Sequence, residues 1–161
     1  RVLLPVWGIV DQICEGYALD EEIRYSGSSG GAATALALHC LQNGGFGGVL
    51  HTGSRRDAPY LNETVVSVNR QDLLERTGSR YAPSSPCEGL HELLERDGKF
   101  VFIGKPCDVA ALRKIMRLRP DIEEKVGLTI AFFCDKSGTG CVPCSITAGF
   151  EGSTQTAGRE T

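Results

Sequence analysis

Long apolar runs and a strong net charge are both missing from this chain. Hydrophobic residues make up 41% of its 161 residues, but no run approaches the roughly 20 apolar residues of a membrane helix, so we expect no membrane span. The formal net charge of −3 gives no electrostatic basis for binding nucleic acid, so we expect no nucleic-acid partner. The apolar run within residues 1–5 is too short for the core of a secretory signal, which predicts a cytoplasmic protein.

Cysteine, in contrast, is abundant, with seven residues in the chain. In a reducing compartment such a surplus indicates metal or redox chemistry rather than structural disulfides. Cys134, Cys141 and Cys144 lie close together in the sequence, and the last two form a CxxC with the spacing of zinc or iron–sulfur ligands. Cys14 and Cys40 fall within segments expected to be a strand and a helix, and we expect both in the core.

Strand-like and helix-like patterns alternate along most of the chain. This alternation predicts an α/β fold with a mostly parallel or mixed sheet flanked by helices. The expected strands are 48–52, 64–68, 99–103 and 126–133, the expected helices are 32–42, 70–77, 88–96 and 109–118, and 6–18 is expected to be extended. Residues 135–161 are rich in Gly, Ser and Thr and show little periodicity, so we expect one domain over 1–134 followed by an irregular, cysteine-containing tail.

A serine–glycine loop opens the first of these expected helices. It consists of Ser26, Gly27, Ser28, Ser29, Gly30 and Gly31. Backbone N–H groups at a helix start, together with serine hydroxyls, can bind an anion such as a phosphate. The same residues could also be only a helix cap with a flexible approach, and the sequence leaves both interpretations open. The loop matches neither a P-loop nor a dinucleotide-binding glycine motif.

A second candidate turn, Gly104–Asp108, follows an expected strand. Ligands of open α/β sheets bind at this end of the strands. Pro106 suits the first turn of the next helix, and Cys107 at a helix start is suited to act as a thiolate ligand or nucleophile. Cys134 also ends a strand, so both sulfurs could reach one edge of the sheet. The alternative is that these two cysteines are small buried core residues.

Three further side chains could contact a cofactor. Lys105 could pair with a phosphate, although a solvated loop charge is the simpler interpretation. Arg80 could hold a phosphate while Tyr81 stacks on an aromatic ring, or the two could merely anchor a turn. No metal-type spacing links the three histidines, which we expect to be surface or satisfied structural residues: His39, His51 and His91.

Four motifs in this order resemble a known family. They are the segments 24–31, 77–84, 102–114 and 127–134, with sequences RYSGSSGG, TGSRYAPS, FIGKPCDVAALRK and GLTIAFFC. The series is similar to the family of coenzyme F420 hydrogenase and dehydrogenase beta subunits, which includes related chlorophyll-pathway reductases of plants and cyanobacteria. The resemblance covers about Ile9 to Cys134.

The resemblance implies a flavoprotein that moves electrons between FAD, a 4Fe-4S cluster and an organic or deazaflavin acceptor. Carried over by motif, the Ser26–Gly31 loop and Arg80 with Tyr81 become candidate flavin contacts, and Cys107 and Cys134 become candidate cluster ligands, to which the CxxC adds Cys141 and Cys144. Lys105 stands where many members have a small polar residue. The expected partner is a redox subunit or a small electron carrier, in a homo- or hetero-oligomer.

The chain also departs from the family pattern. Members commonly carry an upstream cysteine-rich segment and a large second portion, so we expect this chain to be incomplete and not to catalyse the reaction alone. Three hypotheses therefore stay open: a flavin and iron–sulfur oxidoreductase domain, a noncatalytic electron-transfer or assembly subunit, and a small α/β domain with structural zinc. The zinc ligands in the third case would be Cys107, Cys134, Cys141 and Cys144.

Overall fold

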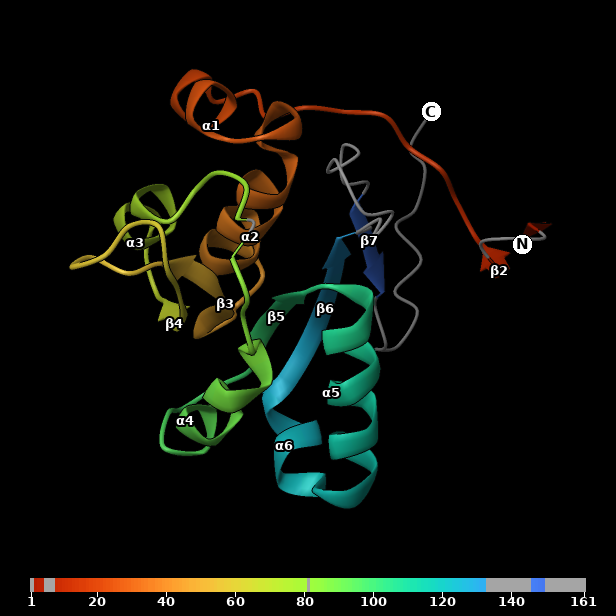
Figure 1. Cartoon of the computed structure of the whole chain (residues 1–161). Helices are drawn as coiled ribbons and strands as arrows, with labels where there is room; N and C mark the ends of the chain where they lie inside the picture. Colours follow the sequence, from red (N-terminus) through yellow and green to blue (C-terminus); the bar gives the residue numbers. More distant parts are fainter. Residues whose placement is uncertain (1, 5–7, 81, 133–145, 150–161) are drawn as a thin grey trace.

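The computed structural model describes residues 2–4, 8–80, 82–132 and 146–149, and its centre is a five-stranded mixed sheet (Figure 1). The strand order is β4-β3-β5-β6-β7. These strands are β3 (Gly48–Ser54), β4 (Asn62–Ser67), β5 (Phe100–Gly104), β6 (Val126–Phe132) and β7 (Ile146–Gly149). β3, β5 and β6 run parallel, while β4 and β7 pair antiparallel at the two edges. The predicted α/β fold with a mixed sheet and flanking helices is confirmed.

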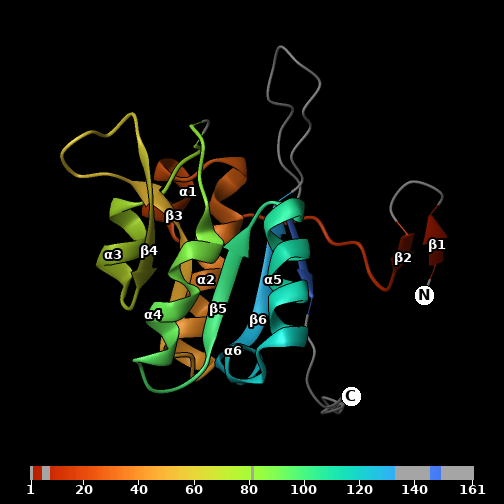
Figure 2. The same ribbon diagram turned by 60° about the horizontal axis from the view of Figure 1, so that its bottom comes forward.

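Helices cover both faces of this sheet (Figures 1 and 2). One face carries α1 (Glu21–Ser26), α2 (Ala32–Asn43) and α3 (Arg70–Glu75), and the other carries α4 (Leu90–Leu94), α5 (Pro106–Leu118) and α6 (Pro120–Lys125). Two 3-10 turns, η1 (Ser29–Gly31) and η2 (Pro86–Gly89), precede α2 and α4. Within the described residues, none of the helices is both long enough and apolar enough to cross a bilayer.

The central strand β5 divides the core into two layers. All five of its residues are buried. Val101 and Ile103 pack with the α1, α2 and α3 side chains, while Phe100 and Phe102 pack with those of α4, α5 and α6. This alternation follows from the two-residue period of a strand, and it explains why a strand covered on both faces has a continuous apolar sequence.

The strongest sequence patterns are confirmed, with shifts of one or a few residues at their ends. The helix expected over 32–42 is α2, which ends at Asn43 just before Gly44, and the strand expected over 99–103 is β5. The helix expected over 88–96 is instead η2 followed by the shorter α4. Cys40 is buried as expected, but Cys14 is exposed, so its assignment to the core is wrong. Cys14 lies in an irregular segment that no helix or strand holds against the core.

Two helices and a strand of the main sheet were not predicted. α1 and α6 have only six residues each, too few to show a helical period. α1 begins after Asp20, whose side chain caps it, and α6 begins with Pro120 in its first turn. β7 lies in the segment expected to be irregular, so that expectation is wrong for Ile146–Gly149. Pairing with the free edge of β6 satisfies backbone groups that would otherwise lack partners, and the β-branched Ile146 and Thr147 suit this role.

A separate two-stranded sheet lies at the start of the chain. β1 (Val2–Leu4) and β2 (Gly8–Val10) pair antiparallel, with Leu3 opposite Ile9. Both views place this pair away from the five-stranded sheet (Figures 1 and 2). The described part of the segment expected to be extended, 6–18, contains only β2. Its residues 11–17 form no regular strand.

Candidate functional site

The two turns selected from the sequence lie toward the same edge of the sheet. In both ribbon views, the arrowheads of β5 and β6 point to that edge. The first turns of α2 and α5 lie there as well (Figures 1 and 2). It is the carboxyl edge of the parallel strands, where open α/β sheets bind ligands.

The serine–glycine loop is built by its backbone conformation. Ser29, Gly30 and Gly31 are three consecutive residues with positive φ angles of 51°, 68° and 71°. Glycine adopts this region without cost, whereas Ser29 is strained there. The loop is held from outside by the Ala18 N–H group, which donates to the Gly30 carbonyl oxygen at 2.8 Å.

Close backbone packing explains two of the glycines. A Cβ atom on Gly31 would lie 2.5 Å from the Ile23 carbonyl oxygen, and one on Gly27 would lie 2.7 Å from the Gly31 Cα atom. The loop therefore folds directly onto the end of α1, and α1 is anchored in turn by ion pairs from Arg70 of α3 to Asp20. The start of α2 has no side-chain cap, because its N-cap residue is Gly31.

Ser79, in the second of the four family-like motifs (77–84), contacts this loop. The Ser28 hydroxyl accepts the Ser79 N–H at 3.1 Å and lies 2.8 Å from the Ser79 hydroxyl, although these residues are 51 positions apart. The adjacent Arg80 donates from Nη2 to the Thr77 carbonyl oxygen at 3.3 Å, but its buried Nε has no hydrogen-bond partner among the described residues. A buried donor of this kind costs free energy unless a bound group satisfies it. Tyr81 lies outside the described residues.

The second turn is organised by Asp108. Its Oδ2 atom accepts the Lys105 N–H at 2.9 Å and pairs with the Lys105 Nζ at 2.8 Å. The Lys105 ammonium also lies 2.9 Å from the Ser84 hydroxyl. Gly104 permits this arrangement, because a Cβ atom there would lie 2.9 Å from the Asp108 Cβ. Ser79 therefore contacts the serine–glycine loop, and Ser84, five residues later, contacts this turn.

Cys107 is exposed in the first turn of α5, directly after the end of β5. This placement contradicts the alternative that Cys107 is a buried core residue, because its side chain is accessible to a bound group. Its Sγ lies 4.0 Å from the Asp108 Oδ1. Cys134, Cys141 and Cys144, the other expected ligands, lie outside the described residues. Among the residues that are described, no three His, Cys, Asp or Glu side chains are grouped closely enough to hold a metal ion.

The sequence analysis missed Cys87, which lies beside this turn. Its Sγ donates to the Asp108 carbonyl oxygen at 3.5 Å, and burial raises the pKa of the Cys87 thiol, with a further contribution from the Asp108 charge. A single cysteine in a turn-rich stretch gives no spacing signal, so only the packing of η2 against α5 shows this neighbour.

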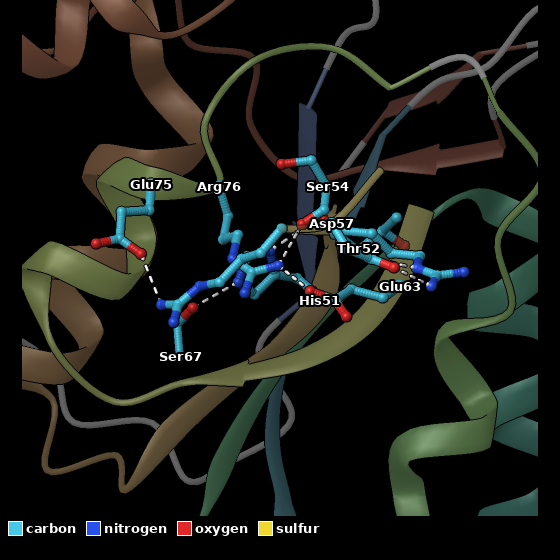
Figure 3. Close-up of polar contacts among 10 residues, drawn as sticks. His51, Thr52, Ser54, Asp57, Glu63, Ser67, Glu75 and Arg76 are labelled. Carbon is cyan, nitrogen blue, oxygen red and sulfur yellow. Dashed lines mark hydrogen bonds and ion pairs between the residues drawn. The ribbon is translucent and has the colours of Figure 1, made fainter. Parts of the chain in front are cut away.

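A second polar cluster lies between β3, β4 and the end of α3 (Figure 3). His51 is buried, with Nε2 2.8 Å from the Ser67 hydroxyl and Nδ1 3.2 Å from the Thr52 carbonyl oxygen. Burial lowers the pKa of His51 to about 4, so the ring is neutral at pH 7. Arg76 bonds to Glu63 and to the Ser54 carbonyl oxygen. The expectation that His51 is a satisfied structural histidine is confirmed.

Two family models match successive parts of the chain. Residues 13–91 match the N-terminal part of the coenzyme F420 hydrogenase/dehydrogenase beta subunit, and residues 97–140 match its C-terminal part. The first match ends within α4 and the second begins just before β5, so both matches contribute strands to one sheet.

Individual relatives agree with these matches. The beta subunit of coenzyme F420 hydrogenase from Methanosarcina barkeri is 32% identical over 121 residues, which cover 71% of this chain and 41% of the relative. The coenzyme F420-dependent sulfite reductase of Methanocaldococcus jannaschii is 32% identical over 90 residues, covering 55% of this chain and 14% of that protein. A chain in the xenon-derivatised F420-reducing [NiFe] hydrogenase complex from Methanosarcina barkeri superposes with a TM-score of 0.63 at 32% identity, covering 70% of this chain and 40% of that one. The chain thus spans less than half the length of each of these proteins.

Proposed function

The chain belongs to the family of coenzyme F420 hydrogenase/dehydrogenase beta subunits, and we propose that it binds FAD and contributes ligands to a 4Fe-4S cluster in an oxidoreductase of that family. Flavin exchanges electrons in pairs or singly and an iron–sulfur cluster conducts them one at a time, so the two groups together link a hydride carrier to a one-electron chain. The protein's part in this proposal is to hold the two groups at the carboxyl edge of its sheet.

The buried Arg80 Nε without a partner among the described residues is the observation that carries the flavin proposal. It belongs to the segment that the Ser28–Ser79 contact holds against the serine–glycine loop, next to the uncapped start of α2. A guanidinium and free N–H groups at a helix start are the donors that a diphosphate accepts from. These residues fit the pyrophosphate of FAD: the loop would bind it through the backbone, and Arg80 would neutralise its charge.

The cluster proposal rests on Cys107 and on the family's motifs. An exposed thiol in the first turn of a 13-residue helix fits a cluster ligand, because its sulfur is accessible to iron directly after the end of β5. Cys134, Cys141 and Cys144 are the further ligands we propose. Lys105 is a weaker flavin candidate, since its ammonium is already paired with Asp108 and bonded to Ser84.

We also propose a deazaflavin acceptor and a partner subunit. One relative is named as the beta subunit of coenzyme F420 hydrogenase, and the similar solved chain comes from an F420-reducing hydrogenase complex. Exposed apolar side chains precede the serine–glycine loop, including Ile13 at 78% and Leu19 at 90% exposure, which suits a surface that another chain covers.

Flavin retention by Arg80→Met tests the first half of the proposal. The protein is purified anaerobically, its flavin is quantified, and FAD affinity is measured by fluorescence quenching. We expect Arg80→Met to weaken FAD binding at least tenfold, about 1.4 kcal/mol, because it removes a charge that contacts phosphate. Arg117→Met, at an exposed position in the last turn of α5, is the matched control and keeps full affinity. Equal affinity in both variants would contradict the proposed flavin site.

Iron content tests the second half. Cys107→Ser is expected to lose iron after anaerobic reconstitution with ferrous ion and sulfide, because serine is a poor ligand for the cluster. Cys14→Ser removes another exposed thiol, outside the proposed site, and is expected to keep its iron. Full retention of iron by Cys107→Ser would show that Cys107 is not a ligand, and zinc in place of iron would favour the structural-zinc alternative.

A further inference from the structure

The turn that carries Cys107 also contains a shielded charge pair. The Lys105 ammonium lies 2.8 Å from the Asp108 carboxylate, and these side chains are only 32% and 14% exposed. The ammonium also donates to the Ser84 hydroxyl at 2.9 Å, and the Lys105 N–H donates to the carboxylate at 2.9 Å. The pair is therefore both ordered and less screened by solvent than an ion pair on an open surface.

This pair flanks Cys107 on both sides in the sequence and approaches it in space. Asp108 Oδ1 lies 4.0 Å from the Cys107 Sγ, within the range of a sulfur contact. Pro106 and the cap formed between Lys105 and Asp108 hold the backbone of this turn in its helical conformation. A group bound to the Cys107 sulfur would thus sit beside a fixed carboxylate, whose other oxygen is paired with the Lys105 ammonium.

We propose that Lys105 and Asp108 set the reduction potential of an iron–sulfur cluster bound through Cys107, with Asp108 lowering the potential and Lys105 raising it. This inference rests on the proposed function, since it assumes a cluster at Cys107. Reduction adds one electron to the cluster, so a nearby negative charge disfavours the reduced form and a nearby positive charge favours it. Net charge close to the cluster and solvent exposure are among the main determinants of such potentials.

The chain allows each charge to be removed while the turn is kept. Asp108→Asn retains an oxygen that can accept the Lys105 N–H, so the start of α5 remains capped. Lys105→Met keeps the length of the side chain and removes only the ammonium. Asp121→Asn is the matched control, because Asp121 forms a similar pair with Arg119 beyond the far end of α5. That helix has 13 residues, about 20 Å at 1.5 Å per residue.

The experiment is a potentiometric titration followed by electron paramagnetic resonance, on the full chain after anaerobic reconstitution with ferrous ion and sulfide. The midpoint is read from the loaded fraction, so partial loading of a variant does not affect it. We expect Asp108→Asn to shift the midpoint upward, Lys105→Met to shift it downward, and the double variant to return close to the parent. Asp121→Asn is expected to leave it unchanged.

The outcomes separate this inference from the proposed function. A parent protein without iron, or iron that persists fully in Cys107→Ser, would overturn the proposed cluster and this inference with it. Iron lost in Cys107→Ser, together with single variants that shift the midpoint in the same direction or not at all, would overturn the inference alone. A merely structural role for the pair would not produce opposite shifts that cancel in the double variant.

Discussion

The edge loop around Gly30 and the cluster around His51 place polar groups inside the protein in two different ways. In the loop, the conformation is set by the backbone, and the neighbouring Arg80 keeps a buried donor without a partner among the described residues. In the cluster, both ring nitrogens of His51 are bonded and the Arg76 guanidinium contacts an acid and a carbonyl oxygen (Figure 3). Buried polarity alone therefore does not indicate a binding site. The unsatisfied Arg80 donor beside a backbone shaped by glycine is the reason that we propose a binding site at the loop.

Because the backbone of the serine–glycine loop is closely packed, we expect that adding a methyl group to one of its glycines destabilises the protein. Gly31→Ala places a methyl group 2.5 Å from the Ile23 carbonyl oxygen in a residue with a φ of 71°. We expect the free energy of unfolding to fall by roughly 3 kcal/mol or more, because left-handed strain and displacement of α1 both contribute. Gly45→Ala is the control, since its φ is 68° but no atom lies within 4 Å, and it should cost only about 1 kcal/mol. Equal losses in urea denaturation would show that close packing at Gly31 is unimportant.

The cluster, in contrast, is expected to be sensitive to acid. Folded His51 binds its proton near pH 4, and the unfolded chain binds it near pH 6.5, so the unfolded state holds more protons between these values. Stability should therefore fall as the pH decreases from about 6.5 toward 4, by at most roughly 3 kcal/mol.

Denaturation curves between pH 8 and pH 5 can assign this slope to His51. His51→Gln keeps a donor and an acceptor but does not titrate, so its slope should be flatter. His91→Gln changes an exposed histidine and should keep the parent slope. A slope unchanged in His51→Gln would mean that another group causes the acid sensitivity.

The cluster should also be broken by removing one partner. The Arg76 side chain is 12% exposed and bonds to Glu63 and the Ser54 carbonyl oxygen, so we expect Arg76→Met to lower the free energy of unfolding by about 2 kcal/mol. Arg56→Met removes a guanidinium that is 75% exposed and should cost less than about 0.5 kcal/mol. Arg80→Met should also cost little, because the loss of its long hydrogen bond to Thr77 is offset by the removal of an unsatisfied buried donor. The comparison between the two regions fails if Arg80→Met proves as destabilising as Arg76→Met.

Local signals explain which parts of the fold the sequence could predict. β5 combines an apolar run with Gly104 and Pro106 at its end, and α2 combines helix-forming residues with Gly44, so strand, helix and both boundaries follow from short-range patterns. β7 could not be predicted in this way, because its four residues form a strand only through the free edge of β6. α1 and α6 are too short for a periodic pattern to appear.

In the candidate site too, residues in local patterns could be predicted from the sequence, whereas contacts between distant segments could not. Loop composition identified the serine–glycine residues and Cys107, but the Ser28–Ser79 contact joins positions 51 residues apart, which no spacing rule predicts. The Lys105–Asp108 pair could have been predicted, since an acid three residues after a helix start commonly caps it. Cys87 could not, because its relation to Asp108 depends on how η2 packs against α5.

The smallest expected effect on stability separates folding from binding within the loop. Gly30 and Gly45 share a φ of 68°, so Ala at either position carries the same backbone strain of about 1 kcal/mol. A Cβ on Gly30 would lie 3.0 Å from the Tyr17 Cβ, a contact that requires the irregular segment around Tyr17 to shift by a few tenths of an ångström. The two variants should therefore have similar melting temperatures, while only Gly30→Ala changes the backbone where FAD is proposed to bind. We expect FAD affinity, measured by fluorescence quenching, to fall several-fold in Gly30→Ala and to stay unchanged in Gly45→Ala. Equal affinities at matched stability would mean that the left-handed turn serves only to connect α1 to α2, and that the open donors at this edge serve another ligand.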